Sequence, residues 1–153
     1  MSWLSGKDLE DKIKKNADDE TWNAFLGVFS IDTLPEQIHS FPILLIINTQ
    51  TSNLPGLHWK AVYISKERIG EVFDSFALPV SICLTQWLNR FTRSWHSQSL
   101  TIQHPLTATC GAFVVYYILM RIHERSLQNC LRIFSTNLSR NDRIVKEFVK
   151  LLK

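Results

Sequence analysis

The amino-acid sequence predicts an α+β fold in which a small mixed or antiparallel sheet packs on a central helix. Short apolar or alternating segments at 41–48, 58–64 and 69–76 are typical of strands. The segment 112–120 (AFVVYYILM) is apolar on every side, which is typical of a helix buried inside a protein. At 153 residues the chain is long enough to form a core of its own, so we expect one domain over 1–153.

The N-terminal segment has helix signals followed by breakers. Ser5 with Asp8 three residues later resembles a capping box and predicts a short surface helix at 6–16. Acidic residues precede a second short turn around 21–25. Residues 25–35 contain a glycine and a proline, which predict an extended or looping connection.

The next part of the chain predicts a buried strand and a hairpin. The run FPILLIIN at 41–48 is a continuous apolar segment, and 49–56 is made of turn-forming residues. The segment HWKAVYI at 58–64 has side chains on alternating faces, and a short turn at 65–68 joins it to 69–76. These two segments therefore predict an antiparallel hairpin.

The C-terminal half is predicted to be mostly helical. Residues 81–93 have apolar positions at helical spacing, and 126–134 predict a second helical piece. Between these helices we expect a polar loop at 95–99 and a short strand at 100–103. Asn141 is predicted to cap a last amphipathic helix.

Composition excludes several classes of protein. The net charge is +3 and the basic residues are scattered, which favours a solvated surface over a nucleic-acid site. No segment has the roughly 18 consecutive apolar residues of a membrane helix, and no secretory signal is evident, so we expect a cytosolic or nuclear protein. The three cysteines include no C-x-x-C pair, which argues against a disulfide framework and a structural metal.

Cys110 is the candidate nucleophile. It stands at the predicted start of the central helix, where the backbone dipole stabilises a thiolate. Gly111 allows close backbone approach, and the polar loop 104–109 keeps the thiol near the surface. A buried structural cysteine explains the same local pattern equally well, so the assignment depends on the rest of the chain.

His58 is the candidate base, because it opens a predicted strand and strand ends are rigid. Its imidazole needs an acceptor on the second ring nitrogen. Counted outward from the turn, the hairpin register brings Asp74 within a residue or two of His58, and Glu71 is the alternative acceptor. Roles as strand-edge surface residues are the alternatives for His58 and Asp74.

Gln103 lies seven residues before Cys110 and is the candidate oxyanion donor. Its amide and the Cys110 backbone N–H would supply two donors to a developing oxyanion. A polar residue at a strand end is the alternative. The remaining histidines compete with His58 for the role of base but are less well placed: His39, His96, His104 and His123.

The spacing of these residues resembles the adenovirus-type endopeptidase (adenain) family, which has relatives in other DNA viruses and in Polinton/Maverick elements. The resemblance spans roughly 20–125 and rests on the following segments: LHWKAV at 57–62, FDSF at 73–76, Gln103 with Cys110-Gly111-x-Phe113, FLGVF at 25–29 and IINT at 46–49. The order His, acid, Gln, Cys also resembles the wider clan of SUMO- and ubiquitin-like-protein-specific cysteine proteases.

This resemblance implies a role for each candidate residue. Cys110 would be the nucleophile, His58 the general base and then acid, and Asp74 the group that orients His58. Gln103 would form the oxyanion hole with the Cys110 amide, and Trp59 would pack beside the site and contact substrate. The implied chemistry is peptide-bond hydrolysis through a thioester, with no metal or other cofactor.

The resemblance also implies partners. Substrates would be viral or transposon structural precursors cut beside small residues such as Gly-Gly, in the host nucleus or cytoplasm and in the virion. A short activating peptide and DNA would be partners, and a membrane would not. Neither Cys83 nor Cys130 matches the cysteine that binds such a peptide, and the C-terminus is shorter than in adenain. Two other functions fit the same residues: a deSUMOylase-like or deubiquitinase-like isopeptidase, and a non-catalytic interaction module.

Overall fold

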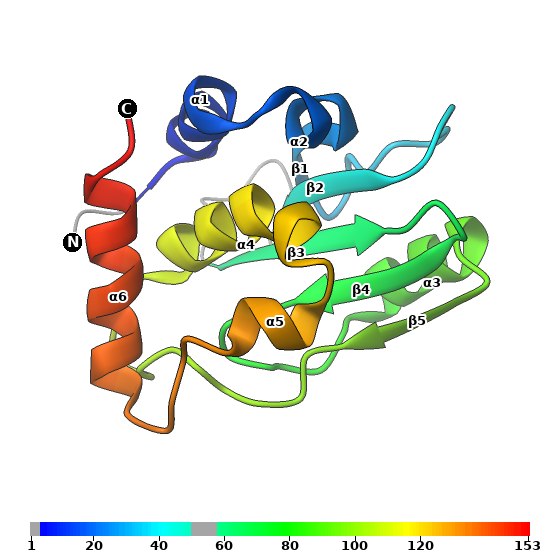
Figure 1. Cartoon of the computed structure of the whole chain (residues 1–153). Coiled ribbons are helices and arrows are strands. Elements are labelled where there is room, and N and C mark those ends of the chain that lie inside the picture. The colour runs from blue at the N-terminus through cyan, green and yellow to red at the C-terminus, as the bar shows by residue number, and fades with distance from the viewer. Residues whose placement is uncertain (1–3, 50–57) are drawn as a thin grey trace.

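The structure is a computed structural model that describes residues 4–49 and 58–153 (Figure 1). The strands are β1 (Phe25–Ser30), β2 (Ile43–Asn48), β3 (Trp59–Ile64), β4 (Ile69–Phe73) and β5 (Ser94–Ser97). The helices are α1 (Gly6–Asn16), α2 (Asp19–Ala24), α3 (Ile82–Phe91), α4 (Cys110–Glu124), α5 (Leu127–Leu131) and α6 (Leu138–Lys150).

The strands form one mixed sheet in the order β1-β2-β3-β4-β5. The central pairs β2/β3 and β3/β4 are antiparallel, and the outer pairs β1/β2 and β4/β5 are parallel. The α+β class and the sheet packed on a central helix are therefore confirmed. The predicted hairpin is β3 and β4, with Ala61 opposite Phe73 and Ile64 opposite Gly70.

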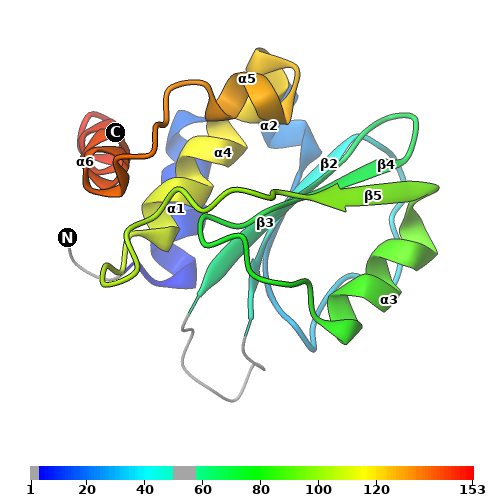
Figure 2. The same cartoon turned by 90° about the horizontal axis from the view of Figure 1, so that it is seen from below.

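Helices cover both faces of the sheet, as Figure 2 shows. On one face Trp59, Ala61 and Phe73 pack with the apolar side chains of α4. On the other face the alternate residues Val62 and Ile64 pack with α3. The two-residue period of β3 thus separates two apolar cores, and α4 is the buried central helix that the sequence predicts.

Three sequence predictions in the connections are wrong. The sequence predicts a loop at 95–99, but β5 occupies most of this segment, because its backbone pairs with β4. Residues 100–103 are not in a strand. Asn137, not Asn141, caps α6, since the Asn137 side chain accepts from Arg140 N and Asn141 is buried inside the helix.

At the N-terminus the structure confirms the capping box, with Ser5 and Asp8 each accepting a backbone hydrogen bond from the other. The connection expected at 25–35 begins with strand β1. The turn predicted at 49–56 lies outside the described residues except for Thr49. None of the helices within 4–49 and 58–153 is both long enough and apolar enough to span a membrane.

Candidate active site

One end of the sheet brings His58, Asp74 and Cys110 together. His58 directly precedes β3 and Asp74 directly follows β4, and these two positions are neighbours because the strands are antiparallel. The His58 ring stacks on Phe76, with ring centroids 4.9 Å apart and planes 26° apart. Cys110 is the first residue of α4, which packs on β3.

Asp74 is held from several directions. Its Oδ1 lies 2.6 Å from His58 Nε2 and accepts from the Phe76 N–H at 2.9 Å. Its Oδ2 accepts from the Leu78 N–H at 3.0 Å and lies 3.3 Å from Lys60 Nζ. A carboxylate with this many donors has one orientation, so it fixes the His58 ring as well.

The electrostatics of the pair favour two charged groups. Burial disfavours the imidazolium, but the interactions with Asp74 and Cys110 outweigh burial and raise the pKa of His58 from 6.5 to about 9. Burial alone would raise the pKa of Asp74. The hydrogen bond with His58 and the charges of His58 and Lys60 instead hold it below its usual value of 3.8. At neutral pH the pair is therefore an imidazolium and a carboxylate.

The second nitrogen of His58 is left for Cys110. His58 Nδ1 is buried and has no hydrogen-bond partner of standard geometry among the described residues. Cys110 is nevertheless close enough to contribute to the raised pKa of His58. Because Asp74 occupies Nε2, a proton exchanged between the thiol and this ring passes through Nδ1.

Gln103 is fully buried and its side chain is fixed at both ends. The Ser75 hydroxyl donates to Gln103 Oε1 at 2.5 Å, and Gln103 Nε2 donates to the Thr107 carbonyl at 2.9 Å. The Gln103 backbone N–H also donates to the Ser75 carbonyl. Ser75 follows Asp74 in the chain, so the segment that carries the base also orients the amide.

The start of α4 lacks a side-chain cap. Thr109 occupies the N-cap position, but its hydroxyl donates to Asp142 Oδ1 at 3.2 Å, away from the helix. Asp142 Oδ1 also accepts from the His104 N–H at 3.3 Å. The first backbone N–H groups of a helix have no partner within the helix, so those at and after Cys110 remain available as donors.

The other predicted candidates have different surroundings. Glu71, the alternative acceptor, binds Arg121 and the exposed His96 instead of His58. His123 pairs with Asp18, and the His104 ring accepts from the Leu106 N–H in its own turn.

Trp59 lies next to His58 in the chain and is only 6% exposed. Its indole N–H donates to the Leu4 carbonyl at 3.1 Å. The ring is therefore directed toward the N-terminal segment, and a contact between Trp59 and substrate stays a prediction.

The sequence did not single out four residues that contact the candidate site residues: Lys60, Ser75, Phe76 and Thr107. Lys60 shares a face of β3 with His58, so the alternation of this strand was a signal for it. The contacts of Ser75 and Thr107 with Gln103 join distant segments and had no local signal. Among residues 4–49 and 58–153, no group of three His, Cys, Asp or Glu side chains is placed to bind a metal ion.

The fold is similar to solved structures of a viral protease. Two crystal structures of a protease of African swine fever virus (ASFV) match with TM-scores of 0.69 and 0.66, at 14% and 15% identity, over 99% of this chain and 68% of that protease. The central domain of an uncharacterized Legionella pneumophila protein matches with a TM-score of 0.54 at 14% identity, over 98% of this chain and 95% of that domain. The sequence matches no protein-family model and no curated protein. The chain therefore has the fold of this viral protease.

Proposed function

We propose that this protein is a cysteine protease in which Cys110 attacks a peptide carbonyl and forms a thioester. The observation that carries the proposal is that the two nitrogens of the His58 ring have different surroundings. Asp74 holds Nε2 at 2.6 Å, and Nδ1 is left for a nucleophile that starts a buried helix. The similarity in fold to a viral protease supports the same class of reaction.

The proposed reaction uses Cys110 as nucleophile, His58 for proton transfer and Gln103 as an oxyanion donor. The proton given up by the Cys110 thiol rests on His58 Nδ1, and the sulfur attacks the carbonyl carbon as a thiolate. The oxyanion that forms accepts hydrogen bonds from the Gln103 amide and the Cys110 backbone N–H. When the C–N bond breaks, His58 gives its proton to the leaving amine. Water, deprotonated by His58, then attacks the thioester; the C–S bond breaks, the acid product leaves, and Cys110 and the protonated His58 return to their starting state.

We further propose that the substrates are structural precursors of a virus or a related mobile element, cut beside small residues such as Gly-Gly. The adenain-like segments around His58 and Gln103 support this substrate class. An activating peptide and DNA are proposed partners on the same ground, and the host nucleus or cytoplasm and the virion are the proposed locations.

A peptide library incubated with the protein, with and without DNA, tests the proposal. We expect defined cut sites for the wild type and none for Cys110→Ala. Fusions of ubiquitin-like proteins, run alongside, separate an isopeptidase from a precursor protease. A Cys110→Ala variant that still cuts the same bonds would refute the assignment of the nucleophile.

Alkylation by iodoacetamide is a second test that needs no substrate. We expect Cys110 to react faster than Cys83 and Cys130 at neutral pH, and His58→Ala to slow this reaction only. The structure gives a matched control within the chain, because burial raises the pKa of the Cys130 thiol to about 12. Equal reactivity of Cys110 with and without His58 would favour a non-catalytic module.

A further inference from the structure

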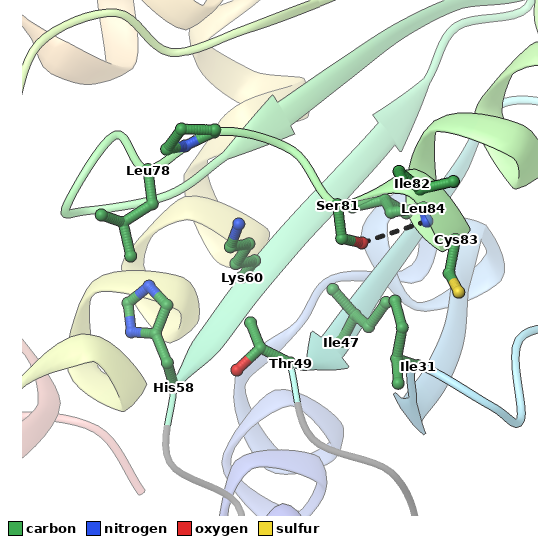
Figure 3. A pocket seen from close by; sticks show the side chains of 11 residues that line it. Ile31, Ile47, Thr49, His58, Lys60, Leu78, Ser81, Ile82, Cys83 and Leu84 are labelled. Carbon is green, nitrogen blue, oxygen red and sulfur yellow. Dashed lines mark hydrogen bonds between the residues drawn. The ribbon is translucent and has the colours of Figure 1, made fainter.

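A pocket of about 400 Å³ opens beside His58, on the face of the sheet that α3 covers (Figure 3). Its walls are mostly apolar and include Ile31, Ile47, Leu78 and Leu84. Figure 3 shows the His58 ring and the Lys60 side chain at one side and the start of α3 at the other. The pocket is therefore a mostly apolar cavity that borders the candidate catalytic base.

The charges around the pocket restrict its occupant. The basic side chains that line the pocket are those of Lys60 and His58. Lys60 Nζ lies 3.3 Å from Asp74 Oδ2. A lysine or arginine side chain would meet like charge there. A carboxylate would compete with Asp74 for Lys60 and weaken the group that holds His58. A neutral apolar side chain is not repelled by Lys60 and does not compete with Asp74, and its removal from water favours binding.

The position of the pocket relative to Cys110 indicates which half of a substrate reaches it. Trp59 packs on the α4 face of the sheet with Cys110, whereas the next residue along β3, Lys60, faces the pocket. His58 lines the pocket and also interacts with Cys110. In the proposed reaction the acyl half stays on Cys110, and the leaving amine takes its proton from His58. The half of the substrate that carries this amine is therefore the half nearer the pocket.

We infer that the pocket binds an apolar side chain, such as that of Leu, Ile, Met or Phe, on the leaving-group side of the cut peptide bond. This inference rests on the proposed protease function and adds a substrate preference to it. The volume of the pocket, its apolar walls and its position beside the general acid carry it.

A series of peptides with a fixed acyl half tests the preference. The acyl half is taken from a sequence that the protein cuts in the library, and the leaving-side residues are varied among Leu, Met, Phe, Ser, Asp and Lys. We expect kcat/KM for the best apolar residue to exceed that for Ser and Lys by roughly tenfold or more. Cleavage with a flat leaving-side profile, or a preference for Asp, would overturn this inference and leave the protease assignment intact. No cleavage of any peptide would overturn both.

A variant that fills the pocket provides the structural control. Cys83 is exposed at the rim in the first turn of α3, so Cys83→Trp places an indole in the opening. We expect the ratio of kcat/KM between Leu and Ser substrates to fall severalfold toward one. The matched control is Gln86→Trp, an exposed position on α3 that does not line the pocket, and it should keep the wild-type ratio. An unchanged ratio in folded Cys83→Trp would overturn the inference.

Capture of the thioester by amines gives a measurement that isolates the leaving side. An added amine attacks the thioester carbonyl, forms an amide and releases the Cys110 thiol. We expect leucinamide to compete with water more effectively than serinamide does, by several-fold in the ratio of amide to acid product. Equal capture of the two amines would contradict the assignment, and this result is independent of how well any variant folds.

Discussion

At the scale of single residues, Asp74 sets the orientation and the charge of His58. It receives hydrogen bonds from two backbone N–H groups, holds His58 Nε2 and neutralises the buried Lys60. All of these contacts lie within residues 58–78, which are the β3–β4 hairpin and the segment after it, so the orientation of His58 depends on local geometry more than on distant packing.

The pH dependence of activity should report the His58–Asp74 pair. We expect kcat/KM to fall as the pH rises through about 9, because the imidazolium that protonates the leaving amine loses its proton there. Asp74→Asn removes a negative charge beside the ring, so its alkaline limb should move to lower pH. Profiles of kcat/KM against pH for both proteins measure this. Identical alkaline limbs would contradict the assigned role of Asp74.

The same proton affects folding stability. The folded-state pKa of His58, about 9, lies above its unfolded value of 6.5, so the folded protein binds this proton more tightly. The stability from this group is fully present below about pH 6.5 and is lost as the pH rises through about 9. We expect the free energy of unfolding, measured in urea, to decline over this window, and to decline less in His58→Gln. Equal slopes for the two proteins would show that another group titrates.

Ser75 should affect the rate of catalysis by holding the Gln103 side chain in place. Ser75→Ala removes the donor to Gln103 Oε1, so the buried amide loses one of the two contacts that fix it. We expect kcat to fall by about tenfold with little change in KM, less than the roughly 10²-fold loss expected for Gln103→Ala. The double variant should lose no more than Gln103→Ala alone. Additive losses would mean that Ser75 acts on something other than Gln103.

At the scale of elements, the β3–β4 hairpin and the first turn of α4 make the site, and β5 supports the hairpin. β5 pairs with β4 in parallel, and the connection from α3 crosses close to Gly70. A methyl group on Gly70 would lie 2.8 Å from Thr92 Cγ2 and 2.9 Å from Trp95 Cβ. This close approach leaves no space for a side chain.

Gly70→Ala should therefore destabilise the protein. We expect a loss of about 1–3 kcal/mol in the free energy of unfolding, because β5 or the end of α3 must move. The control is Gly6→Ala, whose added methyl would meet its nearest neighbours at 3.4 Å and 3.5 Å, which are ordinary contacts. Chemical denaturation compares the two. A Gly70→Ala protein as stable as Gly6→Ala would refute the close packing of β4 against β5.

At the scale of the whole molecule, a buried ion pair ties the sheet to the central helix. Glu71 on β4 accepts from Arg121 on α4 at 2.7 Å and 3.1 Å and from the hydroxyl of Tyr117. The Arg121 guanidinium also lies over the Tyr63 ring of β3, 4.3 Å from its centroid. Tyr117 lies in the middle of α4 and Arg121 in its last turn, so these contacts fix the C-terminal half of the helix against the hairpin.

Arg121→Met should lower the stability of the folded protein. It removes the buried guanidinium from the Glu71 carboxylate, whose other ion-pair partner is the exposed His96, and we expect a loss of about 3–5 kcal/mol in the free energy of unfolding. Adding Glu71→Gln to Arg121→Met removes the uncompensated charge and should recover part of the loss. Urea denaturation of the three proteins measures both effects. A double variant less stable than Arg121→Met would contradict the electrostatic explanation.

The hairpin and the buried helix were predictable from the sequence, and so was a position for Asp74 within a residue or two of His58. Alternation along 58–64 sets which side chains share a face, and the short turn at 65–68 sets the register to within a residue or two. The continuous apolar surface of 112–120 required burial on all sides. These features depend on residues near one another in the chain, which is why a local pattern was enough.

The features that join distant segments could not be predicted from the sequence. β5 is mostly exposed and is polar apart from Trp95, and it is a strand because β4 lies beside it. Asn141 resembles a helix cap in sequence, but it is buried and donates to the carbonyl groups of Ile102 and Ser135. The contact of Ser75 with Gln103 and the pocket beside His58 likewise join segments far apart in the chain. Such contacts depend on the packing of whole elements, and the local sequence does not encode that packing.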